Sequence, residues 1–576
     1  MAFLSNLKAN LSLTCIHLVG FVVSIAGIAA CSSNNAPVND EVLAVVGDFE
    51  ISKTHYLNEL QRVNARAGYA LNLSPDIMES VLNSRLNRYV VVEYARESGW
   101  DQEPEAIYEK ALIERKSIME EFERRFITDH VQVSEQDLRE LFYRVNTSVR
   151  ASHLFARNRH EADSLHALLQ QGRSWDELAA NIFRNPDLAR NGGDLGFFTV
   201  DDMDISFEDM AYRMEIGDVS APVQTSRGFS IIKVTDIVTT PVITETQFAE
   251  KREELGMIAR EQQTELAVRR HLRETINSFD FDNSLIEQLW EDIQNDPEGY
   301  LELNPELNRL QVNLSPEVAG GTVAQLGNFV FTTDDFLREA FYTPFSQRLN
   351  TSSYHDFRRQ VEGMAYRAHA LTSAREHPNY NSHYVQRTIE ETFYNYLNER
   401  FNDYVEQQVV VDEEAIRREF EKNAEFYAEP LQLDMAEIVV TSEQAANHVW
   451  NELQSGADFN ETLRRYTADP AARETNGRLG FIPIDRFGMM APALGQVQPG
   501  EYAGPFQITG ARFHIFKCMG RIEPRPLSYE EAIPKVREVL ATEAADDLKM
   551  RIIGDARDRF NATVFTDRLL SIPKQL

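Results

Sequence analysis

Asn191-Gly-Gly-Asp-Leu-Gly-Phe-Phe198 is the stretch that decides the fold of this chain. Its closely spaced glycines indicate a tight turn of the backbone, and apolar residues follow them. A related stretch, Asn476-Gly-Arg-Leu-Gly-Phe481, begins nearly 300 residues further on. The two stretches therefore indicate an internal repeat.

Three further pairs of segments support this repeat. In each pair the two members share residue types, and their order along the chain is the same in both copies. The pairs are Gly47 with Gly327, Ala95-Arg-Glu97 with Ala374-Arg-Glu376, and Pro241 with Pro526. Four anchors in one order, at nearly constant spacing, predict a tandem duplication.

Each copy shows the same succession of patterns. An apolar stretch turns at Gly-Asp or Gly-Asn, which is typical of a hairpin. Long helical patterns follow, in which Ser74-Pro75 predicts a helix start and Ser134-Glu-Gln-Asp137 predicts a capping box. A mixed α/β segment comes next, and a charged helical pattern over 245–277 or 529–560 ends the copy.

Composition excludes several classes of function. The chain of 576 residues carries 90 acidic and 58 basic residues, whereas nucleic-acid binding needs a basic surface. Its three cysteines, Cys15, Cys31 and Cys518, provide neither a disulfide framework nor a cysteine-based zinc site. The histidines lack metal-ligand spacing. We therefore expect no metal, no cofactor and no nucleic-acid partner.

The N-terminus has the pattern of an export signal. A single Lys8 precedes the almost wholly apolar residues 11–30, and Ile28-Ala-Ala-Cys31 resembles the lipobox of bacterial lipoproteins. That resemblance implies cleavage after residue 30, lipidation of Cys31 and a polar tether over 31–40. The alternative is an uncleaved membrane-spanning helix. Both place the remaining chain outside the cytoplasm. Ser32 after the cysteine resembles lipoproteins that are sent to an outer membrane, which implies an outer rather than an inner membrane and a chain that faces the periplasm.

The mixed segments resemble parvulin-type prolyl isomerases. Arg150-Ala-Ser-His-Leu-Phe155 resembles the first parvulin strand, and Gly192-Gly-Asp-Leu-Gly-Phe197 matches the glycine motif of that family. In the second copy Tyr466-Thr-Ala-Asp-Pro470 matches the family motif Tyr-Ser-x-Asp-Pro. The hairpin and helices that open each copy resemble the chaperone domain of the extracytoplasmic foldases SurA, PrsA and PpiD.

The resemblance implies an α+β fold in which mostly helical chaperone domains carry two inserted parvulin domains, each a small antiparallel sheet flanked by helices. We expect a signal peptide (1–30), a tether (31–40), helical domain 1 (41–148), parvulin domain 1 (149–237), the first closing helix (238–280), helical domain 2 (281–432), parvulin domain 2 (433–521) and the second closing helix (522–576).

Parvulins place two histidines and an Asp or Cys beside an apolar proline pocket, and each copy here lacks part of that set. The first copy has Asn185 at the acidic position, with Asp187 two residues on, and Ser230 at the second histidine; the second has Glu437 at the first histidine. The implied catalytic residues are His153, Asn185, Ser230, Asp469 and His514. The implied substrate-binding residues are Leu195, Met203, Phe207, Leu479, Phe487 and Met490.

The implied activity is cis–trans isomerisation of X–Pro bonds in unfolded or nascent exported polypeptides that contain proline and are rich in aromatic residues. The rotation breaks no bond and needs no cofactor, because its barrier is amide resonance. A membrane is expected as partner only through the N-terminal lipid. The alternative is a holdase whose degenerate parvulin domains bind peptide without catalysis.

Overall fold

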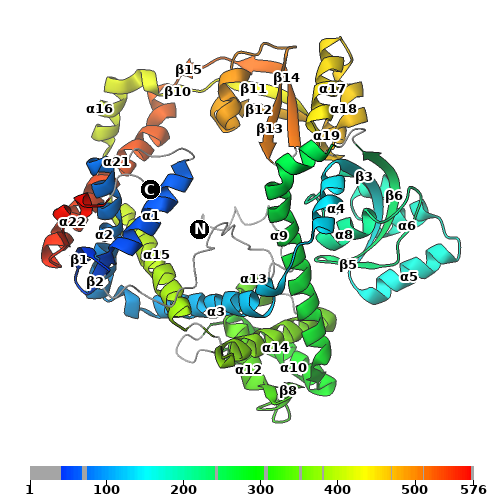
Figure 1. The fold of residues 1–576 in the computed structure, drawn as a ribbon, viewed down its shortest axis with the longest axis horizontal. Helices are drawn as coiled ribbons and strands as arrows, with labels where there is room; N and C mark the ends of the chain where they lie inside the picture. Colours follow the sequence, from blue (N-terminus) through cyan, green and yellow to red (C-terminus); the bar gives the residue numbers. More distant parts are fainter. Residues whose placement is uncertain are drawn as a thin grey trace. The chain divides into compact units, whose positions relative to one another are not determined.

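The computed structural model describes residues 40–67, 74–239, 244–303, 309–348, 353–378, 380, 382–468, 470–509 and 512–572. The predicted signal peptide, the predicted lipidation site Cys31 and the predicted catalytic residue Asp469 lie outside these residues. Two compact units make up the described chain (Figure 1). Residues 127–272 and 428–527 form one, here the sheet unit, and residues 40–126, 273–427 and 528–572 form the other, here the helical unit.

The sheet unit contains two four-stranded antiparallel sheets of the same topology. The first has the order β4-β3-β6-β5 and the second the order β12-β11-β14-β13. In both, the first and last long strands of the segment pair at the centre, which makes the central pairing long-range in sequence. The α+β fold inferred from the sequence is confirmed.

The elements of the first half of the sheet unit are η2 (Thr128–His130), α4 (Glu135–Val145), β3 (Thr147–Ala156), α5 (Arg159–Gln170), α6 (Trp175–Ile182), α7 (Pro186–Arg190), β4 (Asp194–Phe198), α8 (Ile205–Ala211), β5 (Val223–Thr225), β6 (Gly228–Thr239) and α9 (Glu245–Ser278), whose last residues belong to the helical unit.

The elements of the second half are β10 (Ala428–Glu429), β11 (Gln432–Val440), α17 (Glu443–Gln454), α18 (Phe459–Tyr466), α19 (Pro470–Thr475), β12 (Arg478–Pro483), η4 (Ile484–Met490), α20 (Ala491–Leu494), β13 (Tyr502–Thr509), β14 (Arg512–Ile522) and β15 (Arg525–Pro526), which pairs with β10.

The elements of the helical unit are β1 (Val42–Val46), β2 (Phe49–Ser52), α1 (Lys53–Ala67), α2 (Pro75–Glu97), η1 (Trp100–Gln102), α3 (Pro104–Phe126), β7 (Asp280–Phe281), α10 (Asn283–Asn295), α11 (Pro297–Leu301), β8 (Thr322–Leu326), β9 (Phe329–Thr332), α12 (Thr333–Phe341), α13 (Phe345–Arg348), α14 (Tyr354–Glu376), α15 (Ser382–Gln408), α16 (Glu413–Asn423), η3 (Ala424–Phe426), α21 (Tyr529–Arg559), β16 (Thr563–Val564) and α22 (Thr566–Leu570).

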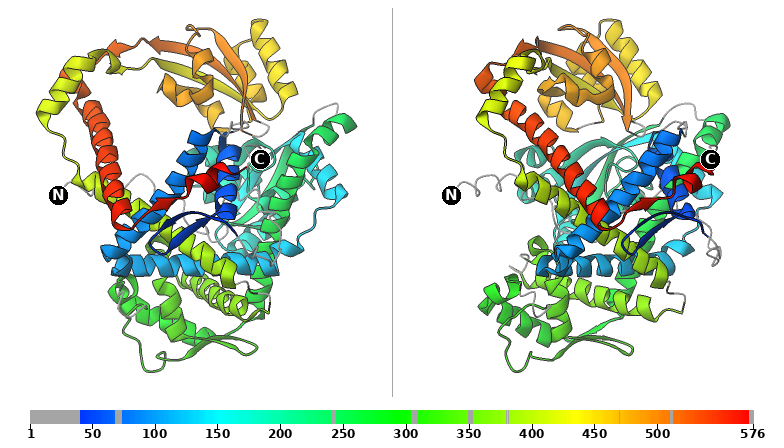
Figure 2. Two further views of the ribbon diagram at one scale, coloured as in Figure 1. Left: turned by 60° about the vertical axis from the view of Figure 1, so that its left-hand side comes forward. Right: turned by 90° about the vertical axis from the view of Figure 1, so that its left-hand side faces the viewer.

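The two copies exchange their closing strands inside the helical unit. β7, which follows the first closing helix, pairs with β8 in the hairpin of the second copy. β16, which follows the second closing helix, pairs with β1 in the hairpin of the first copy. Figure 2 shows this last pairing, with the red end of the chain beside the dark-blue hairpin. Each small sheet of this unit is therefore built from both copies.

The two closing helices also differ in what they cover. α9 packs against α4 in the sheet unit, through a cluster that includes Phe142, Phe248 and Leu255. α21 instead contributes Ile553 and Ala556 to the core of the helical unit, together with α2 and α15. The duplication by itself predicts equivalent helices, but their apolar faces have different partners.

Local predictions on the helices are confirmed. The Ser74 hydroxyl accepts a hydrogen bond from the Ile77 backbone N–H, 3.4 Å away, and Pro75 begins α2. Ser134 and Asp137 form the capping box of α4. Throughout the part of the chain that the structure describes, helices are too short or too polar to span a bilayer.

Candidate active site

The first sheet brings His153 and Ser230 together. His153 lies on β3 and Ser230 on the adjacent strand β6, and the imidazole Nδ1 is 3.2 Å from the serine Oγ. The Ser230 side chain is buried, with 3% of its surface exposed. Both predicted residues therefore meet in one hydrogen-bonded pair, here the first pair.

Aromatic rings surround the imidazole of the first pair. The Phe183 ring centroid lies 5.5 Å from that of His153 at an interplanar angle of 30°, and the Phe207 centroid lies 6.1 Å away at 75°. Burial lowers the pKa of His153 from 6.5 to about 4, because the charged imidazolium loses its hydration there. At neutral pH His153 is thus an uncharged hydrogen-bonding group in apolar surroundings.

The apolar residues predicted for the first copy share one cluster. Phe207 is buried, and Leu195 and Met203 pack against it beside the central strands. The sequence analysis did not single out Phe183, which follows α6 and stacks on His153. An aromatic residue at a helix end carries no signal of such a contact.

Asn185 has a structural contact of its own. Its side-chain oxygen accepts hydrogen bonds from the backbone N–H groups of Asp187 (2.8 Å) and Leu188 (3.4 Å), so that it caps α7. The Asp187 carboxylate pairs with Arg190 on the same short helix. The catalytic role of Asn185 stays a prediction.

Gly193 explains why the glycine motif accompanies His153. Its backbone has φ +72°, and a Cβ added there would lie 2.2 Å from the carbonyl oxygen of His153. The absence of a side chain lets the His153 N–H donate to the Gly193 carbonyl at 3.0 Å. Gly477 repeats this arrangement against Glu437 in the second sheet. Close approach to the strand, rather than the turn alone, requires glycine here.

The second sheet has a pair at the same two strand positions. His514 on β14 places its Nδ1 3.1 Å from Oε2 of Glu437 on β11. Both side chains are mostly buried, with 16% and 17% of their surfaces exposed. We call His514 and Glu437 the second pair. In the first pair the histidine lies on the first central strand, whereas in the second pair it lies on the last one. In both pairs the other strand supplies a polar partner for the histidine.

The apolar residues of the second sheet are placed less uniformly. Phe487 is buried and Met490 packs beside it, in a cluster with Met435 and Phe516. Leu479, at the position of Leu195, exposes 40% of its surface. Roles in substrate binding remain predictions for all three predicted residues.

An ion pair between the edge strand and its neighbour is reversed between the two sheets. In the first, Arg150 on β3 donates to both carboxylate oxygens of Asp194 on β4. In the second, Asp434 on β11 accepts from Arg478 on β12. Burial raises the pKa of Asp194, but the hydrogen bonds from Arg150 and the Gly196 N–H outweigh it and keep that pKa below its ordinary value.

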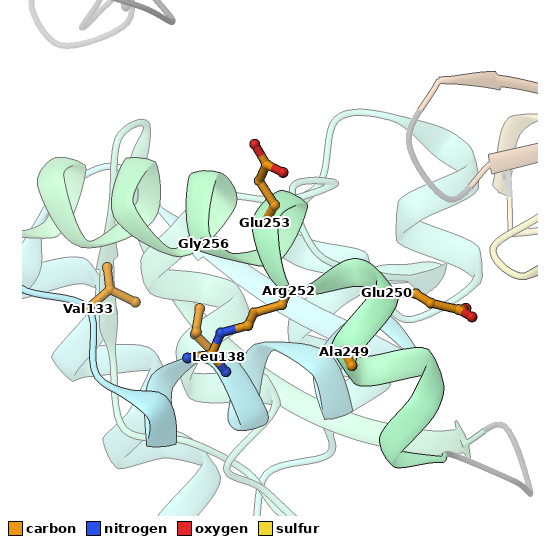
Figure 3. A pocket seen from close by; sticks show the side chains of 7 residues that line it. All are labelled: Val133, Leu138, Ala249, Glu250, Arg252, Glu253 and Gly256. Atoms are coloured by element: carbon orange, nitrogen blue, oxygen red, sulfur yellow. The ribbon is translucent and has the colours of Figure 1, made fainter. Parts of the chain in front are cut away.

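A hollow of about 600 Å³ opens between α4 and α9 (Figure 3). Val133 and Leu138 line one side, and the α9 residues include Arg252 and Glu253. The histidines of both pairs are absent from its lining, so it is separate from the candidate active site. Among the described residues no group of three His, Cys, Asp or Glu side chains is arranged to hold a metal.

Known families match the two sheet-containing segments. Models of the PPIC-type PPIase domain match residues 129–237 and 411–534. The foldase protein PrsA of Oceanobacillus iheyensis is 26% identical over 231 residues, which cover 37% of this chain and 73% of that protein. PrsA of Geobacillus kaustophilus is 29% identical, covering 37% and 76%.

Solved structures were matched as well. The crystal structure of PrsA from Bacillus anthracis is 21% identical and covers 37% of this chain and 88% of its own, with a TM-score of 0.20. One chain from a study of the SurA-like chaperones PEB4 and Cj1289 of Campylobacter jejuni was also matched, at 16% identity, with 42% of this chain and 97% of that chain covered and a TM-score of 0.20. The chain therefore carries two domains of the parvulin (PPIC) type of prolyl isomerase, and over the matched part it is similar to PrsA foldases.

Proposed function

We propose that this foldase isomerises the X–Pro bonds of exported proteins at the first pair, His153 and Ser230. The observation that carries the proposal is the 3.2 Å contact between their polar atoms, beside the apolar cluster of Phe207 and Met203. Leu195, Met203 and Phe207 would hold the proline ring.

The chemistry of the reaction fits such a site. Rotation about an X–Pro bond has to overcome a barrier of roughly 18–20 kcal/mol, which arises from amide resonance. Resonance places charge on the amide oxygen and nitrogen, so an apolar environment disfavours the planar form relative to the twisted one. A neutral imidazole and a hydroxyl can orient the amide by hydrogen bonds without adding charge, and differential binding of the twisted form lowers the barrier.

The second pair is proposed as a second, different site. Glu437 takes the position of the first histidine, so that His514 has a carboxylate rather than a hydroxyl as its partner. Asp469 is proposed to complete this site, with Leu479, Phe487 and Met490 as the apolar part. Each sheet holds a single histidine of the pair, which is the observation that favours a peptide-binding holdase as the second candidate function.

The test is isomerisation of a proline tetrapeptide by the full chain. We expect His153→Ala to lower kcat/KM at least about tenfold, as removal of a preorganised hydrogen-bonding group does in other enzymes. The same measurement on His514→Ala and on the double variant separates the two sites. His160→Ala, an exposed histidine on α5, is the matched control and should retain full activity.

Two results would contradict this proposal. Equal kcat/KM for the native chain, His153→Ala and the double variant would remove the first pair from the mechanism. No acceleration by the native chain, together with suppressed aggregation of an unfolded exported protein, would establish the holdase instead.

We also propose that the protein is held at the envelope by a lipid on Cys31, in an outer rather than an inner membrane. Its relatives are extracytoplasmic foldases, and the residues before Cys31 form an export signal. Labelling cells with radioactive palmitate should mark the native protein but not Cys31→Ser. Clients rich in proline and aromatic residues are expected to bind best, which competition between matched peptides would measure.

A further inference from the structure

The loop between β4 and α8 carries Met203, one wall of the proposed proline site. The Met203 backbone N–H donates to Oε1 of the buried Glu208 at 2.8 Å, and the Asp201 N–H donates to Oε2 at 3.2 Å. Glu208 therefore fixes the loop from inside the domain. The Met203 side chain itself packs against the cluster that contains Phe207.

Asp204, at the end of this loop, joins three segments through one carboxylate. It caps α8 by accepting from the Ser206 N–H at 2.9 Å, and it accepts from the Ser226 N–H of the β5–β6 turn at 2.8 Å. It also accepts from Nη1 of Arg269 on α9, at 3.0 and 3.1 Å. Its side chain exposes 12% of its surface and that of Arg269 exposes 20%, so water competes little for these bonds.

A second bond ties the same helix to the same loop. Nε2 of Gln262 donates to Oδ1 of Asp201 at 2.9 Å. Gln262 and Arg269 are two helical turns apart and thus share one face of α9. Glu265, one turn before Arg269, accepts from its Nη2 at 2.5 Å and holds the guanidinium in place. The loop is therefore held from outside by two residues of α9, and its Asp202 also forms an ion pair with Arg512 on β14.

We infer that Arg269 and Gln262 are positioning residues of the first isomerase site, which act by holding the 201–204 loop and, through it, the Met203 wall. This inference rests on the proposed function of the first pair. Both residues bond to the loop and not to His153 or Ser230, so their effect falls on substrate binding rather than on the pair.

The second sheet is built without this clamp. Phe487 of the second sheet corresponds in the alignment of the two copies to Met203, and the residue after it is Gly488 instead of an aspartate. Glycine has no carboxylate that could accept a hydrogen bond from a helix. The second closing helix, α21, belongs to the helical unit. The carboxylate that accepts from α9 in the first sheet thus has no counterpart at this position of the second sheet.

The experiment measures KM and kcat for a proline tetrapeptide in the full chain carrying His514→Ala, so that only the first site contributes. We expect Arg269→Ala to raise KM about tenfold with kcat changed far less, because a misplaced wall weakens binding. Arg269→Lys should recover part of the loss. Gln262→Ala, which removes a bond at an exposed position, should raise KM in the same direction without a risk of unfolding.

The matched control is Arg252→Ala, since Arg252 is also an α9 arginine in an ion pair, with Glu135 on α4, and is remote from the loop bonds. It should leave KM unchanged. The second readout is the methyl NMR resonance of Met203, assigned with Met203→Leu, which should shift in Arg269→Ala and return towards the native position in Arg269→Lys.

An unchanged KM and an unchanged Met203 resonance in Arg269→Ala would overturn the inference. An equal rise of KM in Arg252→Ala would also overturn it, by showing that α9 only stabilises the domain. If the native chain does not isomerise the peptide, the proposed function fails by itself, and the Met203 resonance together with peptide binding still decides whether α9 positions the loop.

Discussion

Mild acid should lower the stability of the first sheet, and the titration of His153 should account for a defined part of that decrease. Burial lowers the pKa of His153 to about 4, whereas the unfolded chain titrates near 6.5. Between these values the unfolded state binds a proton that the folded state excludes. The stability that the neutral imidazole provides is therefore fully present above pH 6.5 and is lost as the pH falls towards 4.

The magnitude follows from the difference between the two pKa values. At about 1.4 kcal/mol for each pKa unit, the whole window corresponds to about 3 kcal/mol, of which about 2 kcal/mol is lost by pH 5. A loss of 2 kcal/mol corresponds to an approximately thirtyfold fall in protection of the central strands against hydrogen exchange.

Hydrogen exchange with mass spectrometry on the full chain measures the loss of protection in the first sheet itself. Peptides that cover β3 and β6 report on the first sheet, and those that cover β11 and β14 serve as the reference within the same sample. The comparison is between the native chain and His153→Asn, which keeps a polar atom near Ser230 but does not titrate in this range. Other titrating groups affect both proteins equally and cancel in the difference.

We expect protection of β3 and β6 to fall about thirtyfold more in the native chain than in His153→Asn between pH 7 and pH 5, after correction for the intrinsic exchange rate. If the two proteins lose protection in parallel, the imidazole is not held neutral by burial, and the electrostatic description of the first pair is wrong.

Three other perturbations test the surroundings of the first pair. Gly193→Ala should cost at least about 2 kcal/mol in chemical denaturation, because its Cβ meets the His153 carbonyl at positive φ. Burial raises the pKa of Glu208 to about 8, so its contribution to stability is lost as pH rises from 4.5 through 8; Glu208→Gln should raise the melting temperature most above pH 7. Arg150→Asp and Asp194→Arg should each lower the stability of the first sheet, and the double variant should be about 1 kcal/mol more stable than the sum of the two losses predicts, because the second sheet holds the same pair in reversed order. A fully additive loss would contradict this expectation.

Several parts of this protein were predictable from the sequence because they depend on neighbouring residues. The cap at Ser74, the capping box at Ser134 and the hairpin turns at Gly47 and Gly327 need contacts over only a few residues. The duplication and the two parvulin segments are patterns in the sequence itself, and family models of the PPIC-type PPIase domain match both regions.

Part of the site was predictable as well. The positions of His153 and Ser230 follow from matching the family's strands, and the structure places them in contact. The contact of Phe183 with His153 was not predictable in the same way, because it depends on how closely the end of α6 approaches β3. The cap formed by Asn185 is local, and Asn before Pro186 is its signal in the sequence.

The repeat and the two parvulin-type domains were readable from the amino-acid sequence, since periodicity, caps and glycine spacing are local properties. Only the tertiary structure decided that each copy completes the small sheet of the other and that α9 and α21 cover different partners. The physical reason is that the two copies present nearly equivalent strand edges and apolar faces. Which edge pairs with which strand is therefore set by the long-range packing of the whole chain, which no single segment encodes.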